Sequence, residues 1–180
     1  MLENHSLIKA TAVAFLGCLV LASQAISASF EIRRVHPNND AIVASKMPDI
    51  DLSQYEKWTW KWDKHTEDMW VSKQVDINIK DCTVAQSRVP PSPLPPYPAL
   101  PMVDIVLTDV GEKKLAALST QHMKKRIALI LENKLLSVPI IIERMPDGRM
   151  SFSVDDTLAE AQKIASRINE LIGEDRAHRY

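Results

Sequence analysis

Alternating hydrophobic and polar residues dominate the second half of the chain and predict a series of strands. Residues 102–108 (MVDIVLT) alternate in this way, and the segments 128–132 (ALILE), 135–143 (LLSVPIIIE) and 149–154 (RMSFSV) are also predicted to be strands. Pro139 puts the segment 135–143 at a sheet edge or a bulge, because proline donates no hydrogen bond to a neighbouring strand. Turn residues at 133–134 and 146–148 join these strands as hairpins.

The same region contains two segments with helical spacing of apolar residues. Thr108 is expected to cap a helix over residues 109–126. Thr157 and Glu160 form a capping box for a second helix, which Gly173 is expected to end. The order is therefore strand-helix-strand-strand-strand-helix. It predicts the α+β class: a two-layer sandwich with a mostly antiparallel or mixed sheet and two main helices packed on one face.

The first half of the chain is less regular. Residues 30–35 alternate as a strand, whereas residues 37–56 are polar and are expected to form a long connection. Residues 70–79 fit one or two short strands. Asp81 is a plausible N-cap for a short helix over residues 81–88.

The N-terminus has the pattern of a secretory signal peptide. Lys9 precedes an apolar run at 10–22, and small residues follow, with possible cleavage after Ala25 or Ala28. The run is short for a membrane span, which needs about 20 apolar residues. An uncleaved anchor and a lipoprotein modified at Cys18 stay open as alternatives, and they are the only membrane contacts we expect. We predict a periplasmic or secreted bacterial protein.

These patterns divide the chain into four parts. Residues 1–28 form the signal peptide, and residues 29–67 form an N-terminal strand and an irregular, tryptophan-bearing segment. Residues 68–173 form the α+β domain, which includes a proline-rich connector at 90–101 with seven prolines. Residues 174–180 are expected to be a flexible tail.

Charge and cysteine content narrow the class of protein. The net charge is −1, so the basic excess that nucleic-acid binding requires is missing. Removal of the leader leaves a single cysteine, Cys82, which cannot form an internal disulfide. We expect Cys82 to be a small buried residue, and the domain to be stable through packing alone.

The sequence offers no pattern for catalysis. It contains no Gly-x-Ser-x-Gly elbow, no phosphate-binding glycine loop and no His-Glu-x-x-His motif. The histidines at 36, 65, 122 and 178 are scattered, and Asp155 and Asp156 are explained as charges at a helix start. We therefore predict no catalytic residue, no cofactor and no metal site. A hydrolase would need a titratable cluster that only the fold could assemble.

All four tryptophans lie within EKWTWKWDKHTEDMW at 56–70. Trp58, Trp60 and Trp62 occupy alternate positions, so an extended chain directs all three rings to one side. That side is either packed against the domain or a surface for a ligand or partner, and both interpretations stay open. Trp70 belongs to the following strand and is expected in the core.

Residues 102–165 resemble the head subdomain of the first periplasmic domain of SecD/SecDF, a membrane protein that assists protein export. The likeness lies in the serial order of its motifs. A strand ending in Leu-Thr-Asp precedes Gly111 and a lysine pair. The hairpin KKRIALILENKLLSVPIIIE carries a Ser-x-Pro, and the last helix follows RMSFSVDD and begins TLAEA. Residues 71–89 are similar to the family more weakly.

The resemblance implies handling of polypeptides outside the membrane. The chain departs from the family at Glu132-Asn133, where Asp-Gly is usual, and at 145–154, where a glycine-rich stretch is usual. We expect a free-standing, non-enzymatic exported interaction module that binds polypeptide or an envelope protein through a sheet edge or the tryptophan-bearing segment. The alternative is a carbohydrate- or envelope-binding domain that uses the face of Trp58, Trp60 and Trp62.

Overall fold

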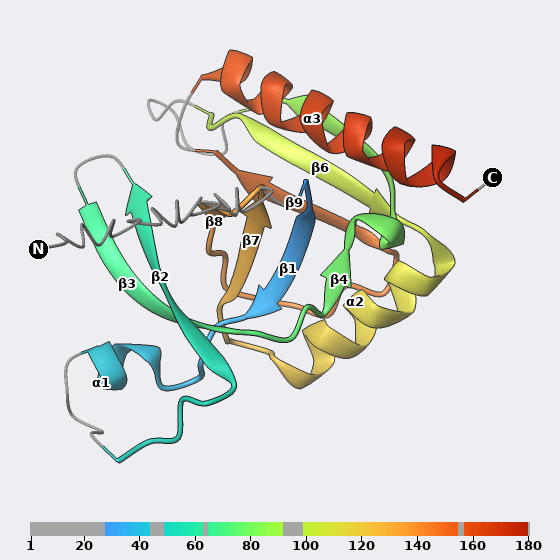
Figure 1. The fold of residues 1–180 in the computed structure, drawn as a ribbon. Coiled ribbons are helices and arrows are strands. Elements are labelled where there is room, and N and C mark those ends of the chain that lie inside the picture. The colour runs from blue at the N-terminus through green and yellow to red at the C-terminus, as the bar shows by residue number, and fades with distance from the viewer. Residues whose placement is uncertain (1–27, 44–48, 63–64, 92–98, 155–156, 180) are drawn as a thin grey trace, which may run out of the picture.

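The structure is a computed structural model that describes residues 28–43, 49–62, 65–91, 99–154 and 157–179 of the 180-residue chain (Figure 1). Nearly all of the predicted signal peptide, most of the proline-rich connector and the Asp155-Asp156 pair lie outside these residues. Within the described part, no helix is both long enough and apolar enough to cross a membrane.

The order of elements confirms the α+β class. Along the described residues the elements are β1 (Phe30–Arg34), α1 (Asn39–Val43), β2 (Tyr55–Trp62), β3 (His65–Ser72), β4 (Ile77–Asn78), a 3₁₀ turn η1 (Ile79–Asp81), β5 (Cys82–Arg88), β6 (Met102–Leu107), α2 (Asp109–Gln121), β7 (Ile127–Leu131), β8 (Lys134–Ser137), β9 (Arg149–Ser153) and α3 (Leu158–Ala177). From β6 to α3 the order is the predicted strand-helix-strand-strand-strand-helix. Both predicted caps are present, because Thr108 accepts from the Gly111 N–H and Thr157 accepts from the Glu160 N–H.

The described strands form three sheets. Their orders are β4-β1-β7-β8, β2-β3 and β5-β6-β9, and every strand pair is antiparallel. In Figure 1, α3 lies along β6, and the β2–β3 hairpin stands to the side of β7 and β8. The main core lies between the two larger sheets and the helices α2 and α3. Its fully buried side chains come from all of these elements: Phe30, Ile32, Ile105, Leu115, Leu129 and Ile168.

Strand β7 is buried on both faces. Ile127, Leu129 and Leu131 face the main core, whereas Ala128 and Ile130 belong to a second apolar cluster on the opposite face. The β2–β3 hairpin covers that second face with buried side chains of β3 and with the half-buried rings of two tryptophans. The segment that we expected to be irregular is therefore an ordered hairpin in the described residues, because β7 provides an apolar surface for it.

Three local predictions are wrong, and the first concerns helix α2, which ends at Gln121 rather than at residue 126. Residues 82–88 form the strand β5 and no helix. The Asp81 carboxylate is already used in the turn η1, where it accepts from the Asn78 N–H and binds the Lys114 ammonium at 2.8 Å. Helix α3 also continues through Gly173 to Ala177, four residues past the predicted end. Gly173 does not adopt the positive φ of a glycine that terminates a helix.

Two asparagine side chains close strand edges. Asn169 of α3 accepts from the Ala85 N–H at 2.8 Å and donates to the Ala85 carbonyl at 2.8 Å, so it occupies the outer edge of β5. Asn39 of α1 accepts from the Trp70 N–H at 2.7 Å and donates to the Asp68 carbonyl at 3.4 Å on β3. Each asparagine replaces the neighbouring strand over one short stretch, which blocks further strand pairing there.

Gly173→Ala is expected to raise the free energy of unfolding by about 0.5–1 kcal/mol, because glycine inside a helix is less favourable than alanine. A Cβ at Gly173 meets no atom within 4 Å. The control is Gly111→Ala, whose Cβ would lie 2.5 Å from the Asp81 carbonyl oxygen and 2.9 Å from the Leu107 Cβ, so this variant is expected to lose stability. Urea unfolding followed by circular dichroism measures both. Destabilisation by Gly173→Ala would contradict the position of residue 173 inside helix α3.

The buried thiol of Cys82 is expected to make stability fall at alkaline pH. Burial, together with the nearby Asp81 carboxylate, raises its pKa from 9.0 to about 12. Above pH 9 the folded state keeps a proton that the unfolded state loses, so the unfolding free energy decreases as pH rises. Between about pH 8 and pH 10.5, we expect wild type to lose about 1–2 kcal/mol more than Cys82→Ala in urea unfolding. Equal losses would show that the folded-state pKa is not raised.

Asn169→Ala is expected to lower the free energy of unfolding by about 1–3 kcal/mol, because it leaves the buried backbone groups of Ala85 without a partner. Gln162→Ala is the matched control, since Gln162 is exposed on the same helix. Both variants are measured by urea unfolding under identical conditions. If the two lose the same stability, the side chain of Asn169 does not seal the β5 edge.

Candidate functional site

Strand β9 has a free edge. Leu107 N donates to the Gly148 carbonyl at 2.8 Å, and Val154 N donates to the Pro101 carbonyl at 3.0 Å, which fixes the register of β9 on β6. In antiparallel pairing, alternate residues then direct their backbone groups away from β6, and here these are the odd-numbered residues of β9. Among the described residues, no hydrogen bond uses the N–H of Ser151 or Ser153.

A second free edge follows β8. Residues 139–142, which we call the β8 extension, continue along β7 after Ser137. Ile127 N donates to the Pro139 carbonyl, and Ile141 N donates to the Lys125 carbonyl, both at 3.0 Å. This register directs the backbone groups of Ile140 and Ile142 away from β7. Their side chains are 54% and 82% exposed. Pro139 thus lies at a sheet edge, as the sequence predicts.

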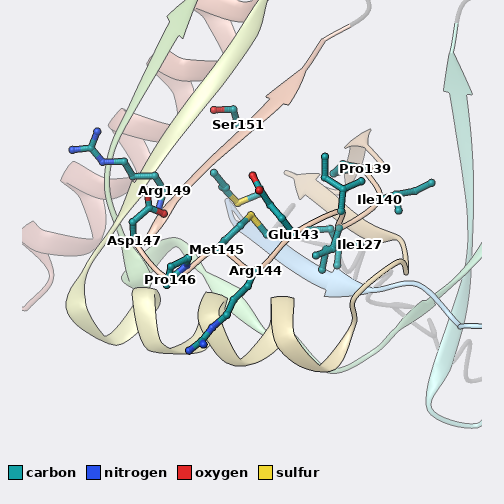
Figure 2. A pocket seen from close by; sticks show the side chains of 13 residues that line it. Ile127, Pro139, Ile140, Glu143, Arg144, Met145, Pro146, Asp147, Arg149 and Ser151 are labelled. Atoms are coloured by element: carbon teal, nitrogen blue, oxygen red, sulfur yellow. The ribbon is translucent and has the colours of Figure 1, made fainter.

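The two free edges border one hollow of about 640 Å³, which we call the edge groove (Figure 2). It is lined by residues 127, 139–147 and 149–151. In Figure 2, Ser151 lies on one side and Pro139 and Ile140 lie on the other, with the loop between β8 and β9 beneath them. The lining combines apolar side chains with exposed backbone edges, which suits a ligand that offers both apolar groups and main-chain hydrogen bonds.

The Ser151 side chain is fixed on the β9 side of the edge groove. Its hydroxyl donates to the Asp104 carboxylate at 2.5 Å, and Arg88 binds the other carboxylate oxygen. Burial acts to raise the pKa of Asp104, but the hydrogen bonds from Arg88 and Ser151 outweigh it and hold this pKa below its ordinary value. Because the hydroxyl is committed to Asp104, the backbone N–H of Ser151 is the group that remains for a ligand.

The predicted tryptophan surface is divided in the structure. Trp58 and Trp60 are half-buried and pack against the second apolar cluster beneath the hairpin. The Trp58 indole donates to the Glu56 carboxylate at 2.9 Å, and Arg33 binds the same oxygen at 2.6 Å. Trp62 ends β2, but its side chain lies outside the described residues. Ligand binding by these residues stays a prediction.

We expected Trp70 in the core, but the structure places it elsewhere. Its register partner is Lys57, and its β3 neighbours Met69 and Val71 are the residues that turn into the second cluster. Since side chains alternate along a strand, Trp70 lies on the other face of the hairpin, where it is half-buried.

Within the described ranges, the side chains that could carry chemistry do not come together in one place. Cys82 is buried, and its raised pKa keeps the thiol protonated and unreactive at neutral pH. In the described part of the chain, no group of three or more histidine, cysteine or acidic side chains could hold a metal ion. His36 packs edge-on against Tyr55, and its pKa is lowered by burial. The geometry offers a surface for binding.

Sequence reasoning missed the edge groove. The signal that it left unused is the run of three isoleucines after Pro139. Side chains alternate in a strand, so three apolar residues in a row lie on both faces, and one of them is exposed wherever only one face is covered. Ile141 is buried, and its two neighbours are the exposed ones. The facing edge on β9 gave no such signal, because RMSFS alternates as any half-buried strand does.

Comparison with known proteins identifies the fold and the family. A family model described as "SecDF, P1 head subdomain" matches residues 55–170. The chain is 35% identical over 66 residues to the protein translocase subunit SecD of Rhodothermus marinus, which covers 37% of this chain and 11% of that protein. The SecD protein of Sebaldella termitidis is 35% identical over 66 residues, which is 37% of this chain. That of Magnetococcus marinus is 32% identical over 65 residues, which is 36% of this chain. The chain spans 16% and 12% of their lengths.

A solved structure shows the same fold. The crystal structure of SecDF in its super-membrane-facing form aligns with a TM-score of 0.54 at 18% identity, over 78% of this chain and 18% of that chain. The family match begins with strand β2 and ends within α3, so it takes in the tryptophan hairpin, the edge groove and both main helices. It covers well over half of the chain, and the chain therefore belongs to the SecDF P1 head subdomain family.

Proposed function

We propose that this chain is a non-enzymatic, exported interaction module that binds extended polypeptide segments in the edge groove. The bound segment adds as a strand to a free edge, and its main-chain groups pair with the outward backbone groups of Ser151 on β9 or of Ile140 on the β8 extension. Strand addition supplies affinity through backbone hydrogen bonds and tolerates many sequences. The observation that carries this proposal is that both free edges line the same hollow.

Two other strand edges are each interrupted by an asparagine side chain, and this contrast supports the proposal. The edge of β5 is occupied by Asn169, and the edge of β3 is occupied by Asn39. Natural proteins normally cover or interrupt free edges, because unpaired backbone groups invite other chains. Edges left open beside an apolar hollow therefore favour a binding role over an accident of folding.

The relatives favour polypeptide as the ligand. The similar curated proteins are named protein translocase subunits, and a chain that shares their head subdomain fits a role in the handling of exported polypeptides. We extend this to a periplasmic or secreted location, with export directed by the N-terminal leader. Carbohydrate binding by Trp58, Trp60 and Trp62 stays the alternative. The inward packing of Trp58 and Trp60 favours the polypeptide interpretation over it.

Ser151→Pro is expected to weaken polypeptide binding by at least about tenfold, because it removes the outward N–H and places a ring at the pairing edge. Proline should be tolerated in the fold, since this N–H makes no bond to β6. Fluorescence anisotropy measures the affinity for a fluorescein-labelled, extended peptide in which valine and threonine alternate.

Ser151→Ala is the matched control. It removes the hydroxyl that binds Asp104 but keeps the backbone N–H, so it should bind the peptide as wild type does. Thermal unfolding confirms that both variants are folded. Equal affinity of Ser151→Pro and wild type would exclude pairing with β9 and restrict strand addition to Ile140 on the β8 extension, whereas no binding of the peptide by wild type would overturn the proposal.

A further inference from the structure

The charged side chains around the edge groove point in different directions. Its lining includes two carboxylates, Glu143 and Asp147, and two guanidinium groups, Arg144 and Arg149. Figure 2 shows the Glu143 carboxylate directed into the hollow, whereas the Arg144 side chain extends away over α2 and the Arg149 guanidinium points outward on the other side. The lining is neutral by count, but the charge that faces the hollow is negative.

The two carboxylates in the lining have no cation of their own among the described residues. Among the described residues, neither Glu143 nor Asp147 forms an ion pair. Asp147 does accept from the Arg149 backbone N–H at 3.3 Å, which holds it beside the start of β9. The neighbouring cations Lys124 and Lys125 line a separate hollow with His36 and Asp40. A cationic side chain in the edge groove would therefore meet a carboxylate without displacing an existing partner.

Apolar surface lies next to this charge. Ile140 is half-exposed at one edge of the groove, and Met145 contributes a flexible, partly buried thioether side chain to its lining, with the buried Met150 behind it. Methionine adapts to side chains of different shape, so it suits a site that accepts varied apolar residues. In an extended ligand, neighbouring side chains point to opposite sides, so apolar and charged residues can be presented to different parts of the groove.

We infer that the edge groove selects extended segments in which lysine or arginine stands beside apolar residues, with Glu143 as the residue that determines this specificity. The inference rests on the proposed function, because it concerns which polypeptides the same groove takes. Arg144 and Arg149 contribute by their orientation, since guanidinium groups turned away leave the carboxylate unopposed. The Glu143 carboxylate repels segments that are rich in glutamate or aspartate.

The test uses three versions of the valine–threonine peptide that differ at one central position, which is lysine, norleucine or glutamate. We expect wild type to bind the lysine version about three- to tenfold more tightly than the glutamate version at low salt, as solvent-accessible ion pairs predict. Glu143→Gln should lose most of this preference and bind the norleucine version as wild type does. Added salt should narrow the preference in wild type.

Asp49→Asn is the matched control, because it removes one exposed negative charge that does not line the groove. It should keep the preference for lysine. If wild type binds all three peptides equally and Ser151→Pro still loses them, the charge inference is overturned while strand addition stands. If Glu143→Gln keeps the full preference, Glu143 is not its source. Failure of wild type to bind any of the peptides would overturn the proposed function itself.

Discussion

Strand β7 carries apolar side chains on both of its faces, and the other layers of the domain depend on burying them. One face, with Ile127 and Leu129, joins the main core under the helices. The other face, with Ala128 and Ile130, would be exposed if the domain had only the two layers that its helices and larger sheets provide. The β2–β3 hairpin supplies the missing cover. Trp58 and Trp60 form part of this cover, which needs large apolar side chains where few others are available, whereas Trp70 lies on the other face of the hairpin.

Much of the fold could be predicted because its strands and helix starts are determined by patterns within short segments of sequence. The strands β6 and β9 alternate, β7 is a short apolar run, and both helices begin at a threonine whose hydroxyl caps the first turn, so residues 102–172 were assigned in the right order. The helix wrongly predicted at 81–88 is a failure in which a distant partner decides the conformation. Aspartate is a common N-cap residue, and Asp81 therefore looked like the start of a helix. Its carboxylate is instead held in the turn before β5 by Lys114 from α2 and by the backbone N–H of Asn78.

The candidate site was beyond the reach of sequence reasoning for the same reason. Its two edges belong to different sheets, and each edge is defined by a register. The register of β9 on β6 decides that Ser151 directs its N–H outward, and the pairing of 139–141 with 125–127 decides the same for Ile140. A shift of either pairing by one residue would turn the backbone groups of Ser151 or Ile140 toward the neighbouring strand and direct those of the adjacent residues outward instead. Sequence patterns show which residues alternate, but they do not show how two strands are aligned.

Open edges beside exposed isoleucines are an aggregation hazard, and the surrounding residues limit it. Pro139 and Pro146 flank the segment, and Glu143 and Arg144 follow the last isoleucine directly, so the exposed apolar stretch of the β8 extension is confined to residues 140–142. An edge this short offers only a few backbone hydrogen bonds, each worth about 0.5–1.5 kcal/mol net. Binding through it is therefore expected to be weak and quickly reversible. Those are the properties that a module needs if it holds a moving polypeptide briefly and then releases it. A longer open edge would bind more tightly, but it would also increase self-association.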